Sequence, residues 1–331
     1  VIRGNNPVNI AVGLNWYLKY HAGIHLSWNG MQAKLPEVLP AVVRKERHET
    51  DMKYRYDLHI HSALSPCAEN EMTPVTIVGQ AKIMGLDFVA IADHNAIGHV
   101  PLALRAGEEF EINVVPAVEI QTREDIHLLC LFERYDDLEK FLSEIPFSER
   151  KNREELFGEQ LYFDEDDNII GKEDRMLLDS AAVSCDDVRE LAESCGGVAI
   201  PAHIDRDANS MLRILGDVPE AYRVVELSTR ATDDEREYWT QRKTVLTSSD
   251  SHVLDTVSEM GEIELGECTV SALIRALRNA CAFVRAINID YVNIDYERDC
   301  AQHTRYSGKL RQGTGKARHR YDNRRKGYAL R

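Results

Sequence analysis

Short apolar runs of strand length alternate with helical patterns between residues 52 and 280. Apolar runs predict strands at 56–60, 88–92, 114–120, 126–132, 198–201, 224–227 and 244–247. Helices are predicted from Thr73-Pro74, near 101–109, from Ser184 to Gly196-Gly197, and at 210–215 and 270–279. Strands that alternate with helices in this way are typical of a parallel α/β sheet or barrel.

The segments on either side lack this alternation. Residues 1–50 predict a short α/β fragment, with a strand running into a helix at 8–18, a strand at 25–28 and a turn at Asn29-Gly30. Residues 281–331 are rich in Arg and Lys without apolar periodicity, and predict an irregular basic tail or a nucleic-acid-binding arm. The predicted domains are therefore 1–50, 52–280 and 281–331, with an acidic surface excursion at 149–179.

Length and charge narrow the classes of function. A chain of 331 residues can bury a large core without disulfide or metal staples. The net charge of −15 disfavours a role in coating long nucleic acids. Phosphate backbones bind proteins through Lys and Arg, and an excess of acidic residues repels them. No run approaches the roughly 20 apolar residues of a membrane span, and the first residues do not have the pattern expected of a signal peptide. The seven Cys form no CxxC pair, so we expect reduced thiols in a cytoplasmic protein.

Histidines and acids collect at the ends of the predicted strands. The two pairs His59/His61 and Asp250/His252 each place both side chains on one face, because alternate strand residues share a face. The other members are His94, Glu119, His127 and His203. Since the carboxyl ends of barrel strands meet at one rim, we expect these residues to share one cleft. Imidazole and carboxylate together suit Zn, Mn or Fe, and a carboxylate can bridge two metals.

Five short motifs resemble the PHP (polymerase and histidinol phosphatase) superfamily over about residues 52–270. They are Asp57-Leu-His-Ile-His-Ser, Ala92-Asp-His-Asn, Val118-Glu, Pro201-Ala-His and Ser249-Asp-Ser-His. An uncharacterised bacterial branch is similar in Ser65-Pro-Cys, Met72-Thr-Pro, Phe157-Gly-Glu-Gln and His203-Ile-Asp-Arg. The resemblance implies a distorted (β/α)7 TIM-like barrel that holds two or three divalent metals and hydrolyses phosphate esters.

The resemblance also implies a ligand set. His59, His61, Glu119 and Asp250 would bind one metal, and Glu119 would bridge to a second metal held by His127 and His203. A third metal would bind His94 and His252. The family usually adds an Asp or His to this third site, where this chain has Pro66-Cys67. Cys67, Glu69 or Glu71 would take that place, or the third metal is weak or absent.

Several other residues receive roles or plainer interpretations. We expect His94 and Arg206 to act in catalysis, with the guanidinium fork of Arg206 clamping phosphate oxygens. The alternative for Arg206 is a surface residue at a helix start. Asp93 orients His94 or caps the next helix, and His99 is expected on the surface. The thiols of Cys130 and Cys195 are expected in core or helix positions.

A second resemblance covers about the first 45 residues. Ile2-Arg-Gly-Asn-Asn-Pro, Gly13-Leu-Asn-Trp-Tyr-Leu-Lys-Tyr and Leu26-Ser-Trp-Asn-Gly resemble the end of the N-terminal domain of bacterial alpha-N-acetylglucosaminidases. No glycosidase barrel is matched, so this resemblance implies no glycosidase site. The two resemblances meet near Lys53, as in a gene fusion or an artificially joined sequence.

The hypothesis from the sequence is hydrolysis of a small phosphomonoester or nucleotide by a metal-bridged hydroxide. One alternative is an oligonucleotide or RNA exonuclease of the same superfamily. Another is a catalytically degenerate metal- or ligand-binding module, which the incomplete third ligand set favours. A carbohydrate-active fusion is disfavoured by the missing glycosidase barrel. The expected partner is a small phosphorylated substrate rather than nucleic acid or a membrane, and the sequence does not indicate an oligomeric state.

Overall fold

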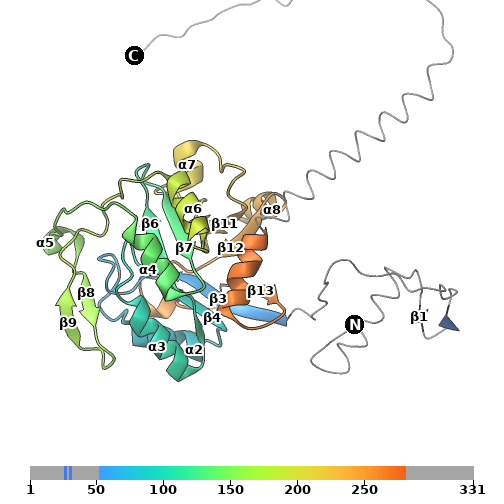
Figure 1. The fold of residues 1–331 in the computed structure, drawn as a ribbon, viewed down its shortest axis with the longest axis horizontal. Coiled ribbons are helices and arrows are strands. Elements are labelled where there is room, and N and C mark those ends of the chain that lie inside the picture. Colours follow the sequence, from blue (N-terminus) through green and yellow to red (C-terminus); the bar gives the residue numbers. More distant parts are fainter. Residues whose placement is uncertain (1–25, 28–29, 32–51, 259, 281–331) are drawn as a thin grey trace, which may run out of the picture. The chain divides into compact units, whose positions relative to one another are not determined.

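The computed structural model describes residues 26–27, 30–31, 52–258 and 260–280 (Figure 1). Strands β1 (Leu26–Ser27) and β2 (Gly30–Met31) pair antiparallel. Gly30, predicted to lie in a turn, thus begins a strand, and Asn29 lies outside the described residues. The predicted elements at 8–18 and the predicted tail at 281–331 lie outside the described residues. Among the described residues, no helix combines the length and apolar character that crossing a bilayer requires.

The longest strand, β3 (Met52–Ile60), is the centre of a mixed four-stranded sheet. It pairs antiparallel with β13 (Gly261–Leu265) and parallel with β4 (Phe88–Ile91), which pairs parallel with β5 (Asn113–Val114). Helices α2 (Pro74–Ile83) and α3 (Val100–Phe110) lie side by side against β4 (Figure 1). As predicted, Pro74 opens α2, and the Thr73 side chain accepts a hydrogen bond from the Thr76 backbone N–H.

The predicted strand at 114–120 is divided between two sheets. Pro116 has no backbone N–H to donate to a ladder, and it separates β5 from β6 (Ala117–Gln121). Strand β6 belongs to a second sheet, in which β7 (His127–Leu131) pairs antiparallel with both β6 and β10 (Val198–Pro201).

The structure therefore departs from the expected parallel arrangement at β7, which runs antiparallel to both of its neighbours. Only residues 122–126 connect β6 to β7, whereas parallel neighbours need a crossover of about a dozen residues or more. A short parallel sheet is formed by β11 (Val224–Leu227) and β12 (Thr244–Thr247). The fold is mixed α/β, and the described strands do not pair into a closed barrel.

Alternate residues of β7 enter two different cores. Leu128 and Cys130 pack with α4 (Tyr135–Ser143) and α6 (Cys185–Ser194) on one face. Leu129 and Leu131 pack on the other face with Leu58 of β3 and with the helix at 270–280. The period of two that separates the faces of a strand thus fixes the register of this sheet. The predicted cap of α6 is present, because Ser184 accepts from the Asp187 backbone N–H.

Backbone hydrogen bonds join the sheets near the strand ends. His61 donates to the carbonyl of Ser251, Asn95 to that of Glu119, and Ile204 to that of Glu226, over 2.8–2.9 Å. Each bond crosses from one sheet to another, beyond the regular ladders. Hydrogen bonds of the backbone therefore hold the strand ends together.

The acidic segment at 149–179 is more ordered than expected. It contains α5 (Glu154–Phe157) and the hairpin of β8 (Leu161–Phe163) and β9 (Ile169–Lys172). Leu161 and Phe163 pack against Ala63, and Asn95 donates to the carbonyls of Leu177 and Asp179. The few apolar residues in this charged segment are not spaced with the period of a helix or a strand. The sequence therefore did not predict these elements.

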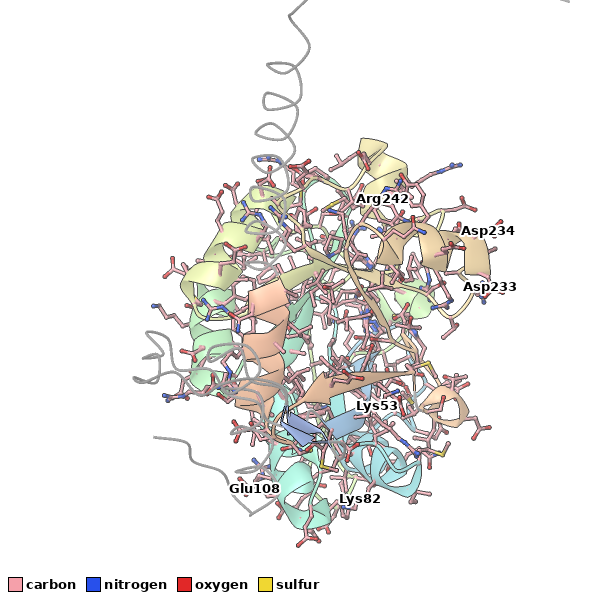
Figure 2. The ribbon with its side chains drawn as sticks, turned by 90° about the vertical axis from the view of Figure 1, so that its right-hand side faces the viewer. Lys53, Lys82, Glu108, Asp233, Asp234 and Arg242 are labelled. Carbon is pink, nitrogen blue, oxygen red and sulfur yellow. The ribbon has the colours of Figure 1, made fainter. Side chains whose placement is uncertain are left out.

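Helices α7 (Met211–Leu215) and α8 (Asp233–Thr240) and the short 3-10 turn Leu254–Thr256 complete the described fold. Charged side chains are spread over its exposed surface, as Figure 2 shows for Lys53, Lys82, Glu108, Asp233, Asp234 and Arg242. Ionisable groups belong at such positions unless they are paired. A group of them that is buried therefore needs its own explanation.

Gly158 allows the segment before β8 to touch the loop after β3. Its φ of +99° is accessible to glycine, and a Cβ there would overlap the carbonyl oxygen of Pro66.

Gly158→Ala should therefore lower the free energy of unfolding by about 3 kcal/mol or more, measured by chemical denaturation. The matched control is Gly216→Ala, where φ is +83° but nothing lies within 4 Å. That variant should lose only about 1 kcal/mol, and equal losses in both would contradict the close approach.

Candidate metal centre

Eight sequence-predicted residues come together at one end of the strands. They are His59, His61, His94, Glu119, His127, His203, Asp250 and His252. Strands β3, β4, β10 and β12 deliver their residues at or just after their carboxyl ends. Strand β7 runs the opposite way, so its first residue, His127, reaches the same edge. The structure thus brings these residues, which are distant in the sequence, to one place.

Glu119 is the centre of this cluster, and its side chain is 1% exposed. Its Oε1 lies 3.0 Å from His127 Nδ1 and 3.2 Å from Nε2 of both His59 and His203. Its Oε2 lies 2.8 Å from His94 Nδ1 and 3.5 Å from His61 Nε2. Burial acts to raise the pKa of Glu119, but His127, His59 and His94 outweigh it and lower the pKa well below its usual value.

Asp250 is a second buried carboxylate beside the two histidines of β3. Its Oδ1 lies 2.9 Å from His61 Nε2 and 3.6 Å from His59 Nε2. Its other oxygen accepts from the guanidinium of Arg206, a contact that the sequence did not predict. The two carboxylates therefore face His59 and His61 from different strands.

Many buried polar atoms of the cluster have no hydrogen-bond partner among the described residues. They include His59 Nε2, His61 Nε2, His94 Nδ1, His127 Nδ1, His203 Nδ1, Glu119 Oε2 and Asp250 Oδ1. Leaving such groups unsatisfied is costly, and nearly all buried polar groups in proteins are paired. Nitrogen and carboxylate donors converging in this way are the ligands of Zn, Mn and Fe. The donor set thus fits divalent metal ions.

Three subsets bring their donor atoms within 4.8 Å of one another. They are His59/His61/Asp250, His94/Glu119/His127 and His61/His94/His252. The first contains three of the four residues expected for one metal and lacks Glu119. The second differs from the expected set, because His94 joins Glu119 and His127. His203 also reaches Glu119, so its expected place beside Glu119 is consistent with the structure.

Backbone conformation at the cluster is unusual. Asn95, His203 and Asp250 have φ values of 51°, 32° and 50°, in the left-handed region that non-glycine residues seldom occupy. Such conformations cost roughly 1–3 kcal/mol each and persist where the surroundings over-determine them. His203 and Asp250 are themselves donor residues, and Asn95 immediately follows the donor His94. The strained backbone positions therefore coincide with the residues that direct donor side chains into the cluster.

Glu226 was not identified from the sequence. It lies on β11 with 1% exposure, and its Oε2 accepts from His59 Nδ1 at 2.9 Å and from the His203 backbone N–H at 3.1 Å. A carboxylate on the far nitrogen of a histidine fixes the ring and directs Nε2 inward. The only available signal was an acid inside the apolar strand Val224–Leu227.

Asp57 is a second buried acid without a predicted role. It accepts from the Ser249 backbone N–H at 3.0 Å, and burial raises its pKa to about 7. Asp93 accepts from the Ser62 backbone N–H and from the hydroxyls of Ser62 and Ser65, over 2.6–2.7 Å. It therefore does not cap α3. Because Ser65 Oγ lies 3.2 Å from His61 Nδ1, Asp93 positions His61 through Ser65 instead.

The expectation that His99 lies on the surface is wrong. His99 is 1% exposed, with Nδ1 2.7 Å from Ser62 Oγ and Nε2 accepting from the Phe163 backbone N–H. The hairpin β8–β9 covers it, and that hairpin was not predicted. Cys130 and Cys195 are buried, as expected.

Three residues were predicted as the additional ligand of a third metal, namely Cys67, Glu69 and Glu71. Cys67 is exposed, and its sulfur is not part of the group of His61, His94 and His252 whose donor atoms lie within 4.8 Å of one another. Burial of the sulfur acts to raise the Cys67 pKa, but hydrogen bonds from His252 and His94 outweigh it and lower the pKa to about 7. Glu69 and Glu71 are exposed, and no contact joins their carboxylates to the cluster within the described ranges.

Comparison with known proteins supports both predicted resemblances. Residues 1–41 match the family model of the alpha-N-acetylglucosaminidase (NAGLU) N-terminal domain. Alpha-N-acetylglucosaminidase of Homo sapiens is 42% identical over 55 residues, which are 17% of this chain and 7% of that protein. The 5'-3' exoribonuclease of Haemophilus influenzae is 32% identical over 83 residues, which are 24% of this chain and 29% of that protein. The chain thus spans less than a third of both curated relatives.

A solved structure shares the fold of the described body. The lesion-specific endonuclease PfuEndoQ from Pyrococcus furiosus has a TM-score of 0.50 at 18% identity, covering 69% of this chain and 56% of that chain. A two-domain protein containing a predicted PHP-like metal-dependent phosphoesterase, from Bacteroides vulgatus, has a TM-score of 0.44 at 14% identity, covering 72% and 67%. At this identity the likeness to PfuEndoQ shows the fold alone.

Removing a donor should remove bound metal. His59→Ala and Asp250→Ala each delete a side chain of the first subset, so each should weaken metal binding about tenfold or more, measured by metal analysis after dialysis. The matched control is Leu138→Ala, which lowers stability from helix α4 and should retain the metal. Full metal content in both donor variants would contradict the assigned site.

Proposed function

We propose that this chain is a metal-dependent phosphoesterase that hydrolyses a small phosphomonoester or a nucleotide. The observation that carries the proposal is the buried carboxylate of Glu119, which five imidazoles surround within 3.5 Å. Four of the nitrogens that face it have no hydrogen-bond partner among the described residues, those of His59, His61, His94 and His127. Structural histidines seldom gather in this number around one acid. Perturbed ionisable groups concentrated in one place are typical of functional sites.

The donor sets suggest which residues would hold two or three ions of Mn, Zn or Fe. His59, His61 and Asp250 would hold one ion, and Glu119 would be shared with the donors His94, His127 and His203. When bound, such ions activate water near neutral pH and neutralise charge on phosphate oxygens. Glu226 keeps His59 in one orientation, because its Oε2 accepts from the Nδ1–H of that ring.

Arg206 is suited to receive a phosphate group at the edge of the cluster. One of its Nη atoms is bound to Asp250, while its side chain is 39% exposed. A guanidinium presents five N–H donors, so the remaining donors can bind two phosphate oxygens. The contact with Asp250 fixes the direction of the fork. Arg206 is therefore our candidate for orienting the substrate next to the metal ligands.

The proposed site lies where seven strands follow one another in a cycle. Ladders join β3 to β4, β6 to β7, β7 to β10 and β11 to β12. The parallel bridges Ile60–Ser251 and His94–Glu119, and the bond from Ile204 to the Glu226 carbonyl, supply the other links. This order supports a distorted seven-stranded barrel with incomplete hydrogen bonding. We assign the activity to residues 52–280.

A second candidate function is an RNA or oligonucleotide exonuclease. It is favoured by the segment that is 32% identical to the 5'-3' exoribonuclease of Haemophilus influenzae. The net charge of −15 weighs against long polyanions but not against short ones, because repulsion grows with the number of phosphates near the surface. Short 5'-phosphorylated oligonucleotides are therefore the substrates that distinguish the two functions.

The substrate class can be tested with metal-loaded protein and three panels of substrates. Mononucleotides and sugar phosphates should release inorganic phosphate, whereas a 5'-phosphorylated oligoribonucleotide should release it slowly or not at all. Stepwise release of mononucleotides from the oligonucleotide would favour the exonuclease. Protein that holds its full metal complement and hydrolyses nothing would instead be a noncatalytic binding module. Glu119→Gln should abolish hydrolysis, and Glu262→Gln on exposed strand β13 should not.

Arg206 can be tested separately from the metal ligands. Arg206→Ala should lower kcat/KM by about 100-fold, because charged donors to the transition state are lost, and metal content should be retained. Arg206→Lys should recover part of the loss, since Lys restores the charge without the fork. Arg230→Ala, on an exposed turn after β11, is the control. Unchanged kcat/KM in Arg206→Ala would exclude Arg206 from substrate binding.

A further inference from the structure

A series of buried polar side chains leads from hairpin β8–β9 to the metal cluster. From the hairpin inward its members are His99, Ser62, Asp93, Ser65 and His61, and each is 2% exposed or less. Neighbouring members are joined by hydrogen bonds of 2.6–3.2 Å. Of the five, His61 is the one proposed as a metal ligand. The other four are therefore candidates for holding that ligand in place from outside the cluster.

The hydroxyl of Ser65 determines which nitrogen of His61 carries a hydrogen. A hydroxyl donates one hydrogen bond and accepts two, whereas a carboxylate accepts only. Ser65 Oγ donates to Asp93 at 2.7 Å and accepts from the His94 backbone N–H at 3.2 Å. Its remaining lone pair therefore accepts from Nδ1–H of His61, which lies 3.2 Å away. Nε2 of the neutral ring is then bare, as metal binding requires, and it faces Asp250 Oδ1 at 2.9 Å.

The hydroxyl of Ser62 fixes the hydrogen of His99 in the same way. It donates to Asp93 Oδ2 at 2.6 Å and accepts from the Leu64 backbone N–H at 3.2 Å. The remaining lone pair accepts from Nδ1–H of His99, 2.7 Å away. Nε2 of the same ring accepts from the backbone N–H of Phe163 on β8, over 3.2 Å. Because one nitrogen donates and the other accepts, His99 is a neutral ring that joins the hairpin to Ser62 and Asp93.

Close packing keeps His99 and the hairpin together. The ring of His99 lies at 88° to that of Tyr162, with centroids 5.8 Å apart. Gly98 permits this approach, because a Cβ at that position would overlap the Tyr162 ring. In addition, the Leu161 backbone N–H donates to the Ala63 carbonyl at 2.9 Å. A change in the position of the hairpin would therefore move both His99 and the loop after β3.

We propose that His99 is a positioning residue of the metal centre. Hairpin β8–β9 holds its Nδ1–H against Ser62, which keeps the carboxylate of Asp93 aligned. Asp93 in turn orients Ser65, so that His61 stays in the tautomer that binds metal. This inference rests on the proposed function, because it assigns the support of the same metal site. The acidic segment that contains the hairpin is then part of that support.

The tautomers can be measured in the unmodified chain. Spectra that correlate ¹H and ¹⁵N in the zinc-loaded chain, labelled with ¹⁵N-histidine, should show Nδ1–H and a bare Nε2 for His99. They should show a slowly exchanging Nδ1–H for His61, because its buried hydrogen bond to Ser65 protects it. A hydrogen on Nε2 of His99 would overturn the proposal, and this measurement requires no variant to fold.

Two substitutions at His99 separate its donor from its acceptor. The amide nitrogen of Asn lies near the place of Nδ1, so His99→Asn keeps a donor for Ser62. The longer side chain of Gln reaches the place of Nε2, so His99→Gln keeps an acceptor for Phe163 and loses the donor to Ser62. His99→Gln should weaken Zn²⁺ binding about tenfold and speed the exchange of the His61 Nδ1–H. His99→Asn should restore both toward the values of the unmodified chain.

The control for a general loss of stability is Leu138→Ala in helix α4, which should leave Zn²⁺ affinity and the exchange of the His61 Nδ1–H unchanged. Unchanged Zn²⁺ affinity in His99→Gln, or an equal loss in His99→Asn, would overturn the positioning role and leave the phosphoesterase proposal intact. Hydrolysis of mononucleotides by the unmodified zinc-loaded chain is measured in parallel. Its absence, with the expected tautomers present, would count against the proposed function alone.

Discussion

The buried carboxylate of Glu119 is the constraint on which the rest of the site depends. A charge removed from water is stable only if opposite charge or hydrogen-bond donors replace the lost hydration. Glu119 obtains them from five histidines on β3, β7 and the segments that follow β3, β4 and β10. Because these rings converge on one side chain, the position of Glu119 determines how the strand ends must be arranged around it.

The backbone supports this arrangement independently of the side chains. Hydrogen bonds between sheets tie His61 to Ser251 and Asn95 to Glu119, next to the donor residues themselves. The left-handed conformations of His203 and Asp250 are held within the same network. A second layer of acids, Glu226 and Asp93, orients the rings through Nδ1 or through a serine. Such support holds donor groups in place before any ligand arrives.

Much of the site was predictable because its chemistry sits at strand ends. Donor residues such as His94 and His203 follow the short apolar runs at 88–92 and 198–201. Because the ends of neighbouring strands lie close together, this position predicts that the donor residues meet. Glu226 could not be found in this way, because an acid within an apolar strand looks like a solvent-facing residue until the strand is seen to be covered on both sides. His99 was misplaced because the hairpin β8–β9 that covers it has no clear sequence period. The antiparallel β7 was predictable in principle, since its link to β6 is too short for a crossover.

That short link also affects how the cluster is assembled along the chain. Glu119 and His127 lie on one hairpin, with Oε1 and Nδ1 3.0 Å apart, so local folding alone brings this pair together. The contact of His59 with Glu226, by contrast, joins residues 167 positions apart. Closing a long loop costs more chain entropy than closing a short one. The hairpin is therefore the part of the cluster that can form first during folding. The distant histidines can then pack against a pair of side chains that is already in place.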